Sequence, residues 1–197
     1  MKILITAFEP FHGEAQNSSL EVLNHLPDRV GEVEVMKLTL PVSFADAPEV
    51  AGAEIDRLRP QAVIALGQAG TRSCVNLERI AINMAHAKNP DNQGCKPCHE
   101  PVVVGGPDGI FSPVNVDALA DTLQAEGHQC VVSNSAGLYV CNTLYYRLLH
   151  RYAPTLPVLF VHLPYTDYQT PHNATAATPM PLPQMLATIQ ALIPKIR

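Results

Sequence analysis

Three side chains far apart in the sequence have the types needed for nucleophilic catalysis: the thiol of Cys141, the imidazole of His162 and the carboxylate of Glu78. In such a set a thiolate attacks a carbonyl carbon, the imidazole moves the proton, and the carboxylate orients the imidazole and favours its protonated form. The chemistry would be hydrolysis of an amide or ester through an acyl-enzyme. It requires a fold that brings the three residues together.

Cys141 follows an apolar run at 129–135 and an Ala-Gly turn, and we expect a helix to begin close to Leu138. Cys141 would then lie in the first turns of the helix, where the positive end of the helix dipole favours a thiolate over a thiol. The alternative is a small buried side chain among apolar neighbours, which is a common place for cysteine. A nearby base is needed to decide between the two.

His162 lies near the end of the apolar run at 157–165. We expect this run to be a strand, with the imidazole at its carboxyl edge. In a parallel sheet this is the edge at which the strand before Cys141 would also end, so the two side chains could meet. The alternative is a histidine with a purely structural hydrogen bond. Two other histidines, His86 and His99, lie in loop segments, where we expect solvated surface residues.

Glu78 lies in the segment 76–84, whose residues alternate in polarity as in a strand. The carboxylate falls on the same side as two isoleucines, which is an unusual place for a charge. We therefore consider it the group that orients the imidazole. The alternative is an ion pair with Arg79 or Arg72.

Apolar, β-branched runs alternate with helical patterns along the chain, which predicts an α/β fold. Parallel strands need crossovers of a dozen or more residues, so this order indicates a three-layer α/β/α sandwich around a mostly parallel twisted sheet. We expect strands at 2–8, 33–40, 61–67, 129–135 and 157–165, and helices within 17–27, 112–127, 137–152 and 180–196.

Local signals place the helix starts and one long loop. Ser18, with Glu21 three residues later, has the spacing of a capping box, and Ser112 is expected to cap the helix that follows it. Residues 88–113 are rich in Gly, Pro, Asp and Asn and predict an ordered loop or a hairpin around 101–106. A long irregular segment of this kind is often a binding element.

The composition limits the classes of function. With 197 residues and 47% hydrophobic side chains, we expect one catalytic domain over 1–197. A net charge of −5 without a basic block argues against nucleic acid as a partner, and no apolar segment is long enough for a membrane span. The cysteines are odd in number and no export signal is apparent, so we expect reduced thiols and a cytoplasmic location. They are Cys74, Cys95, Cys98, Cys130 and Cys141.

A competing hypothesis is a metal-binding or interaction protein built on the loop with Cys95, Cys98 and His99. The C-x-x-C-H pattern offers two or three zinc ligands and also matches a haem attachment pattern. A closed structural zinc site needs four ligands, however, and no second pair has a matching spacing. We therefore expect loop thiols here, and no metal or other cofactor for catalysis.

Six motifs together resemble the pyroglutamyl peptidase I family of cysteine peptidases: FEPFHG, GQAGTR, NLERIAIN, KNPDNQG, SNSAGLYVCN and FVHLPY. The resemblance implies an α/β/α sandwich, a homotetramer, and hydrolysis of the amide bond after an N-terminal pyroglutamyl residue of a peptide. It also implies that Cys141 is the nucleophile, His162 the general base and acid, and Glu78 the orienting carboxylate.

The resemblance also implies how the flat, neutral lactam ring of the substrate is bound. Phe8 and Phe11 match the aromatic residues that contact the ring, and Gln68 could donate to and accept from the lactam. Tyr139 and Val140 would line the same pocket. A related cysteine amidohydrolase of other acyl specificity would share the three catalytic residues and differ only in this pocket.

The chain departs from the family pattern at three positions. Lys88 stands where the family usually has an arginine near the oxyanion, which keeps the charge but not the planar guanidinium. We expect Lys88 to assist the backbone N–H of Cys141 in stabilising the oxyanion. His12 replaces a usual glycine and Ser18 a usual proline.

Overall fold

The computed structural model describes residues 1–169 and 177–196. Within these ranges a seven-stranded sheet has the order β2-β3-β1-β4-β9-β5-β8, and β6 and β7 form a separate antiparallel pair. The strands of the large sheet are β1 (Lys2–Phe8), β2 (Arg29–Val30), β3 (Val33–Leu40), β4 (Ala62–Gln68), β5 (Val75–Glu78), β8 (Cys130–Ser133) and β9 (Val158–Leu163). The pair consists of β6 (Ile80–Ile82) and β7 (Gly109–Phe111).

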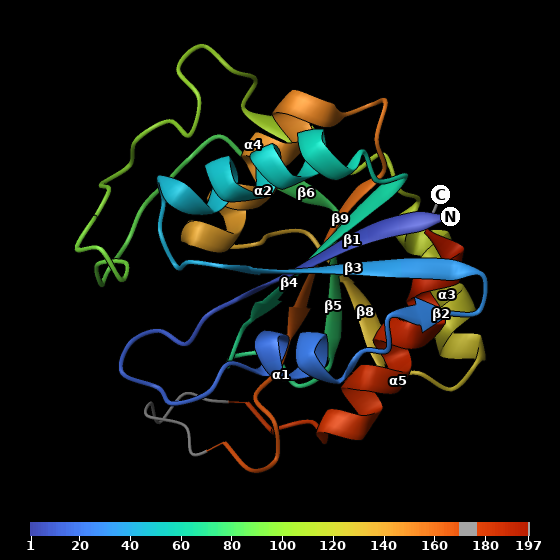
Figure 1. Cartoon of the computed structure of the whole chain (residues 1–197). Helices are drawn as coiled ribbons and strands as arrows, with labels where there is room; N and C mark the ends of the chain where they lie inside the picture. The colour runs from blue at the N-terminus through green and yellow to red at the C-terminus, as the bar shows by residue number, and fades with distance from the viewer. Residues whose placement is uncertain (170–176, 197) are drawn as a thin grey trace.

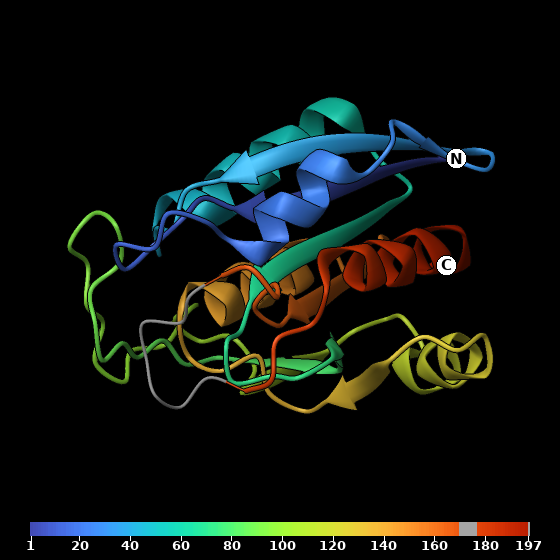
Figure 2. The same cartoon turned by 90° about the horizontal axis from the view of Figure 1, so that it is seen from below.

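Helices cover both faces of the large sheet (Figures 1 and 2). On one face lie α1 (Ser18–His25), α3 (Val116–Ala125) and α5 (Leu182–Leu192), the last continued by the short 3-10 helix Ile193–Lys195. On the other face lie α2 (Asp46–Leu58) and α4 (Val140–Tyr152). Each helical layer encloses an apolar core against the sheet, and every residue of β4 and β9 is buried. The predicted three-layer α/β/α sandwich is therefore confirmed.

The sheet is mostly parallel, but two strand pairings are antiparallel. β1, β3, β4 and β9 run in one direction, whereas β2 pairs antiparallel with β3 and β5 pairs antiparallel with β9. β8 is parallel to β5, so it also runs opposite to β9. The expectation that β8 and β9 end at the same edge is therefore wrong. Residues 134–139 connect the end of β8 to the start of α4.

Two helices begin at residues other than those expected. Asn17, not Ser18, caps α1, and its side chain accepts from the N–H of Ser19 at 3.0 Å. Asn115, not Ser112, caps α3 by accepting from the N–H of Ala118. The Ser112 hydroxyl instead donates to the carbonyl oxygen of Val158 in β9, which takes it out of the capping role. At each helix start two residues of a type that can cap were available, and tertiary contacts determined which of them does so.

Other differences concern one helix and one loop. Helix α2 was not expected, because Pro48 and Gly52 interrupt its sequence; the proline lies in the first turn, where it is tolerated. Residues 101–106 form no hairpin, since the strand that pairs with β6 is β7. The loop after β6 extends to the left of the sheet in both views (Figures 1 and 2). No helix in the described part of the chain is long and apolar enough to cross a membrane.

Candidate active site

The side chains of Glu78 and His162 contact each other on one face of the sheet. In the antiparallel pairing of β5 with β9, Asn76 lies opposite His162 and Glu78 lies opposite Phe160, so Glu78 and His162 are diagonal neighbours on one face. Glu78 Oε1 lies 2.8 Å from His162 Nδ1, and the two side chains are 0% and 6% exposed. At this depth the pair is shielded from water, which strengthens its electrostatic interaction.

Cys141 reaches the same place from α4. Gly67 of β4 lies directly beside His162 in the parallel register with β9. A Cβ added at Gly67 would lie 3.0 Å from Cys141 Sγ and 2.8 Å from Phe160 Cζ, so the sulfur packs closely over this glycine. The sulfur therefore lies above β4 at the level of His162. The thiol, imidazole and carboxylate that the sequence places at 141, 162 and 78 come together in one site.

The surroundings of His162 favour its protonated form. Burial by itself lowers the pKa of an imidazole, but the interactions with Cys141 and Glu78 outweigh it and raise the pKa of His162 from 6.5 to about 9. Only one oxygen of Glu78 has a partner: Oε2 is buried without a hydrogen bond among the described residues. An imidazolium at His162 therefore neutralises a carboxylate that would otherwise be a buried, uncompensated charge.

The structure does not show the alternatives considered for Cys141 and Glu78, which were a small buried apolar side chain and an ion pair with a neighbouring arginine. Arg79 pairs with Asp117 at 2.5 Å, and Arg72 donates to Ser133 Oγ, so neither arginine is paired with Glu78. Cys141 is half-buried and packs at the border of the apolar core under α4, with part of its surface accessible. It is therefore not a fully enclosed apolar side chain.

Helix α4 begins at Val140, two residues later than expected, so Cys141 is its second residue. Tyr139 precedes the helix and makes no side-chain capping bond, which leaves the first N–H groups of the helix without an intrahelical or capping partner. These groups and the helix dipole make the start of α4 a suitable place for a developing negative charge. The sequence placed Cys141 close to a helix start, and that general placement is correct.

Asn142, which the sequence did not single out, holds this helix start in place. Its side-chain oxygen accepts from the N–H of Ile82 at 3.0 Å, and its amide donates to the carbonyl oxygens of Ile82 and Met84. The side chain is 0% exposed. Its position directly after the cysteine is the signal from which a supporting role could have been inferred.

An aromatic wall stands beside the nucleophile candidate. The ring centroid of Tyr139 lies 6.4 Å from that of Phe11 and 5.2 Å from that of Phe44, and the rings of Tyr139 and Phe44 meet edge to face. Phe8 is buried in the core beneath α4, and Val140 is 1% exposed, so its side chain contributes to the core. Phe11 and Tyr139 are half-buried, so part of each ring is accessible, and the predicted substrate contacts of all four residues stay predictions.

Burial, together with the nearby charges of Asp91 and Cys141, raises the pKa of Tyr139 to about 12. The phenol is thus neutral at physiological pH and donates to the carbonyl oxygen of Pro90 at 3.0 Å. This bond ties the loop after β6 to the start of α4.

A cavity of about 310 Å³ opens at the edge of the sheet to which β4 and β9 lead. Gly70 lies two residues after β4, and Tyr165 two residues after β9, so the strands that carry Gly67 and His162 both lead to it. Its lining comprises Phe11, His12, Glu14, Gly70, Thr71, Asn89 and Tyr165. The backbone φ angle of His12 is +54°, a region that favours glycine, which accounts for the glycine usual at this position.

Gln68 forms hydrogen bonds within the protein. Its side-chain oxygen accepts from the N–H of Ser18 at 2.7 Å and from Gln169 at 2.8 Å, and its amide donates to Glu14 at 2.7 Å. The other Glu14 oxygen accepts from the hydroxyl of Tyr165. Since a proline has no N–H, the serine at 18 creates one of these bonds. A direct contact of Gln68 with a ligand stays a prediction, and one amide hydrogen is available for it.

Lys88 is exposed on the surface in the loop after β6. Two residues earlier, the N–H of His86 donates to the carbonyl oxygen of Leu138 at 2.9 Å. The loop that carries Lys88 is therefore attached to the segment before Cys141. A role of Lys88 near the oxyanion stays a prediction.

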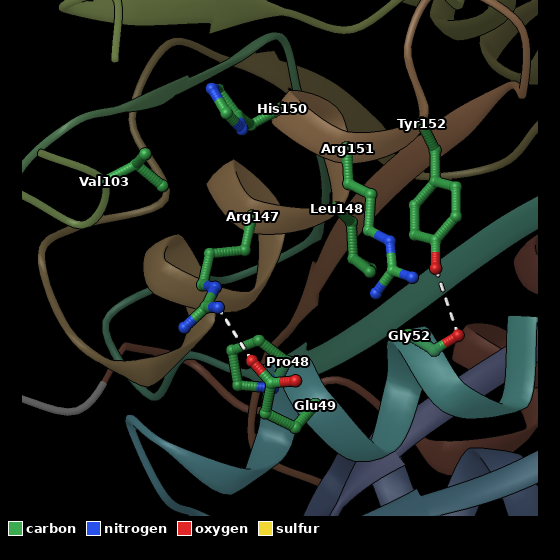
Figure 3. Close-up of a pocket in the computed structure, with 9 residues that line it drawn as sticks. All are labelled: Pro48, Glu49, Gly52, Val103, Arg147, Leu148, His150, Arg151 and Tyr152. Atoms are coloured by element: carbon green, nitrogen blue, oxygen red, sulfur yellow. Dashed lines mark hydrogen bonds and ion pairs between the residues drawn. The ribbon is translucent and has the colours of Figure 1, made fainter. Parts of the chain in front are cut away.

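A larger cavity, about 420 Å³, lies at the opposite end of α4 against α2 (Figure 3). Its charged side chains are paired: Arg147 with Glu49 at 2.7 Å, and Arg151 with Asp56 at 2.6 Å. The hydroxyl of Tyr152 donates to the carbonyl oxygen of Gly52 at 3.0 Å (Figure 3). This cavity lies at the end of α4 away from Cys141, so its size does not make it the catalytic site.

Comparison with known proteins connects this arrangement to a family. The family model described as pyroglutamyl peptidase matches residues 1–197. The chain belongs to the pyroglutamyl peptidase family. The pyrrolidone-carboxylate peptidase 1 of Caldanaerobacter subterraneus is 39% identical over 197 residues, which cover 98% of this chain and 96% of the relative. The pyrrolidone-carboxylate peptidase of Erwinia tasmaniensis is 40% identical over 195 residues, covering 98% and 91%.

Solved structures of pyroglutamyl peptidase relatives have the same fold. A variant of the pyrrolidone carboxyl peptidase from Pyrococcus furiosus superimposes with a TM-score of 0.92 at 33% identity and covers 98% of this chain and 97% of that one. The enzyme from Fervidobacterium islandicum gives a TM-score of 0.92 at 32% identity, covering 98% and 96%. The resemblance found in the sequence motifs is thus confirmed over the whole chain.

The contact between Gly67 and Cys141 leads to a test. Replacing Gly67 with alanine is expected to lower kcat by about 100-fold, because the new methyl group displaces the sulfur from its place beside His162. The same methyl meets the buried ring of Phe160, so the free energy of unfolding should fall by about 1–3 kcal/mol. Steady-state kinetics and denaturant unfolding measure the two effects.

Gly52→Ala is the matched control. A Cβ at Gly52 would meet only the ends of two side chains, Arg151 Nη1 at 3.0 Å and Tyr152 Oη at 3.4 Å. This variant should keep its kcat. A wild-type kcat in Gly67→Ala would show that the sulfur does not depend on this glycine for its position.

Proposed function

We propose that this protein is a cysteine exopeptidase that hydrolyses the amide bond after an N-terminal pyroglutamyl residue of a peptide. The observation that carries the proposal is the buried contact of His162 with Glu78, with the Cys141 sulfur over Gly67 beside them. Membership of the pyroglutamyl peptidase family supports the substrate class. The aromatic wall at Phe11 and Tyr139 supports binding of a flat, neutral ring.

The reaction that we propose has two stages. The Cys141 sulfur, its proton transferred to His162, attacks the pyroglutamyl carbonyl carbon, and the carbonyl oxygen becomes negatively charged. His162 then protonates the amine, which leaves as the shortened peptide, and a pyroglutamyl thioester remains on Cys141. In the second stage a water molecule gives a proton to His162 and attacks the thioester, releasing pyroglutamate and the free thiol.

Each residue in this mechanism has a separate physical task. Glu78 fixes the tautomer and orientation of the imidazole through Nδ1, which directs the other ring nitrogen toward proton transfer. The N–H of Cys141 at the uncapped start of α4 stabilises the oxyanion, assisted by Lys88. Apart from the substrate and the attacking water, these steps use side chains and backbone groups of this chain.

The acyl specificity distinguishes this proposal from a related cysteine amidohydrolase. We expect kcat/KM for a pyroglutamyl anilide to exceed that for the matching prolyl anilide by at least about 10³-fold. The two acyl groups share a five-membered ring, but proline carries a charged imino group, whose desolvation in an apolar slot is costly. Chromophore release from the two anilides, measured at one pH, gives the ratio. Equal or reversed values would favour the other acyl specificity.

We also propose that residues 1–197 form one catalytic domain that acts as a homotetramer in the cytoplasm. The five cysteines are free thiols, which supports a reducing compartment. Two large apolar side chains on the surface, Val104 at 89% exposure and Phe111 at 64%, support burial against another copy of the chain. Light scattering during size-exclusion chromatography tests the tetramer; a monomer at micromolar concentration would contradict it.

A further inference from the structure

We propose that His86, Cys98 and His99 form a binding site for one divalent transition-metal ion, and that Zn²⁺ is the ion this donor set suits best. One donor atom from each of the three side chains lies within 4.8 Å of the other two. Two imidazoles and one thiolate are the nitrogen and sulfur ligands that Zn²⁺ takes in proteins. The site is separate from the catalytic residues and nothing in the proposed mechanism requires it.

The spacing of the donors fits a single ion. Cys98 Sγ lies 3.6 Å from His99 Nδ1. With zinc bonds of about 2.3 Å to sulfur and about 2.0–2.1 Å to nitrogen, two ligands at a tetrahedral angle lie about 3.6 Å apart. The rings of His86 and His99 are stacked with centroids 4.1 Å apart. A turn of the exposed His99 ring about its side-chain bonds would direct both imidazoles at one ion.

The backbone holds the two halves of the site together before any ion binds. Ala85 and Glu100 exchange two hydrogen bonds, N–H to carbonyl oxygen, at 2.7 and 3.0 Å, and the N–H of Ala87 donates to the carbonyl oxygen of Pro97 at 3.0 Å. His86 lies between the two donor residues Ala85 and Ala87, and Cys98 and His99 lie between the two acceptor residues Pro97 and Glu100. Ligands presented by a pre-formed ladder lose little conformational entropy on binding an ion.

Two further features of the site indicate a ligand. The Nδ1 atom of His86 is buried and has no hydrogen-bond partner among the described residues, although buried polar atoms are normally paired. His99 has a φ angle of +53°, an uncommon conformation for a side-chain-bearing residue. A metal ion bound through Nδ1 of His86 would give this atom its missing partner.

The ligands differ from those that the sequence pattern suggested. Cys95 is not part of the cluster; its N–H donates to Asp91 Oδ1 at 2.8 Å, and its thiol lies on the surface. His86, which the sequence placed among solvated residues, is half-buried and takes its place. The three ligands leave a fourth tetrahedral position for water or another small ligand.

Binding at this site would join the turn at 97–100 to the segment 85–87 through the side chains as well as the backbone. The N–H of His86 donates to the carbonyl oxygen of Leu138, three residues before Cys141. A bound ion would therefore restrain the loop that contacts the start of α4. The expected signs are a higher melting temperature and a less reactive Cys98.

Cobalt substitution tests the donor set. Co²⁺ is titrated into the Cys141→Ala variant under a non-thiol reductant, so that the candidate catalytic thiol cannot contribute. We expect one equivalent to bind, with a thiolate-to-cobalt charge-transfer band that Zn²⁺ removes. Cys98→Ser in the same background should abolish the band, and His86→Ala or His99→Ala should weaken binding by at least about 100-fold. Cys95→Ser is the matched control and should leave the titration unchanged.

A second measurement uses the unmodified protein and so does not depend on how a variant folds. Cys95 and Cys98 are both exposed, and mass spectrometry follows their alkylation separately. One equivalent of Zn²⁺ should slow alkylation of Cys98 at least tenfold and leave that of Cys95 unchanged. Equal rates at Cys98 with and without Zn²⁺, or a cobalt band that survives in Cys98→Ser, would overturn the proposal.

Discussion

Replacing Cys141 with alanine is expected to reduce kcat for a pyroglutamyl anilide by about 10⁴- to 10⁶-fold, the loss typical of removing a nucleophile that acts together with its base. Without the sulfur, no thioester can form, and only substrate binding, His162 and the uncapped N–H groups of α4 are left to assist attack by water. Alanine fills a half-buried position at the second residue of α4, so the fold should be retained. Chromophore release and a far-UV spectrum measure activity and fold together.

The control for this variant is Cys95→Ser, which removes an exposed thiol in the loop after β6. Its kcat should equal that of the wild type. If Cys141→Ala keeps more than about a tenth of the wild-type kcat, Cys141 is not the nucleophile, because losses at such positions are far larger.

Replacing Glu78 with glutamine is expected to lower kcat by about 10²- to 10⁴-fold at neutral pH, the range that general acid–base catalysis contributes. The charge of Glu78 is one of the interactions that raise the pKa of His162 to about 9 against the effect of burial. With a neutral amide at this position, the pKa of the imidazole should fall, and proton transfer from the Cys141 thiol becomes less favourable. Glutamine has nearly the same volume, so the packing between β5 and β9 is preserved.

The pH dependence separates this effect from a loss of folding. Proton donation to the leaving amine requires protonated His162, so wild-type kcat/KM should decline as the pH rises through about 9. In Glu78→Gln this decline should move to lower pH. A decline that stays near pH 9 in the variant would show that Glu78 does not set the protonation of His162. Glu49→Gln, which removes an exposed carboxylate paired with Arg147, should leave the profile unchanged.

Protonation of His162 also affects stability. Its pKa is raised on folding from 6.5 to about 9, so the imidazolium stabilises the folded protein. This contribution is fully present below about pH 6.5 and is lost as the pH rises through about 9. Above that pH the imidazole is neutral in both the folded and the unfolded chain, so its protonation no longer favours the folded state.

The strands could be predicted from the sequence because each central strand is an uninterrupted apolar run that both helical layers bury. The direction of β5 could not be predicted in the same way, since apolar periodicity is identical for both directions. One signal was present: only six residues separate β4 from β5, too few for the crossover that a parallel strand requires. Helix α2 was not predicted because Pro48 and Gly52 have low helix propensity, but tertiary packing nevertheless stabilises the helix.

The three catalytic candidates could be named from their types and motifs, but their contact is a property of the register. Glu78 meets His162 because β5 pairs antiparallel with β9 and places them diagonally, which no local pattern encodes. Gly67 and Asn142 were not singled out because their roles exist only in the folded chain. Gly67 permits the close approach of the Cys141 sulfur, and Asn142 forms three side-chain hydrogen bonds. The site with His86 depends likewise on the pairing of Ala85 with Glu100.

The covalent intermediate tests the central claim most directly. The enzyme is mixed with excess pyroglutamyl anilide, quenched in acid within the first turnovers, digested and examined by mass spectrometry. We predict a pyroglutamyl thioester on the peptide that contains Cys141, and none on the peptides that contain the other four cysteines. An acyl group on a different residue, or an intermediate that accumulates equally in Cys141→Ala, would contradict the account.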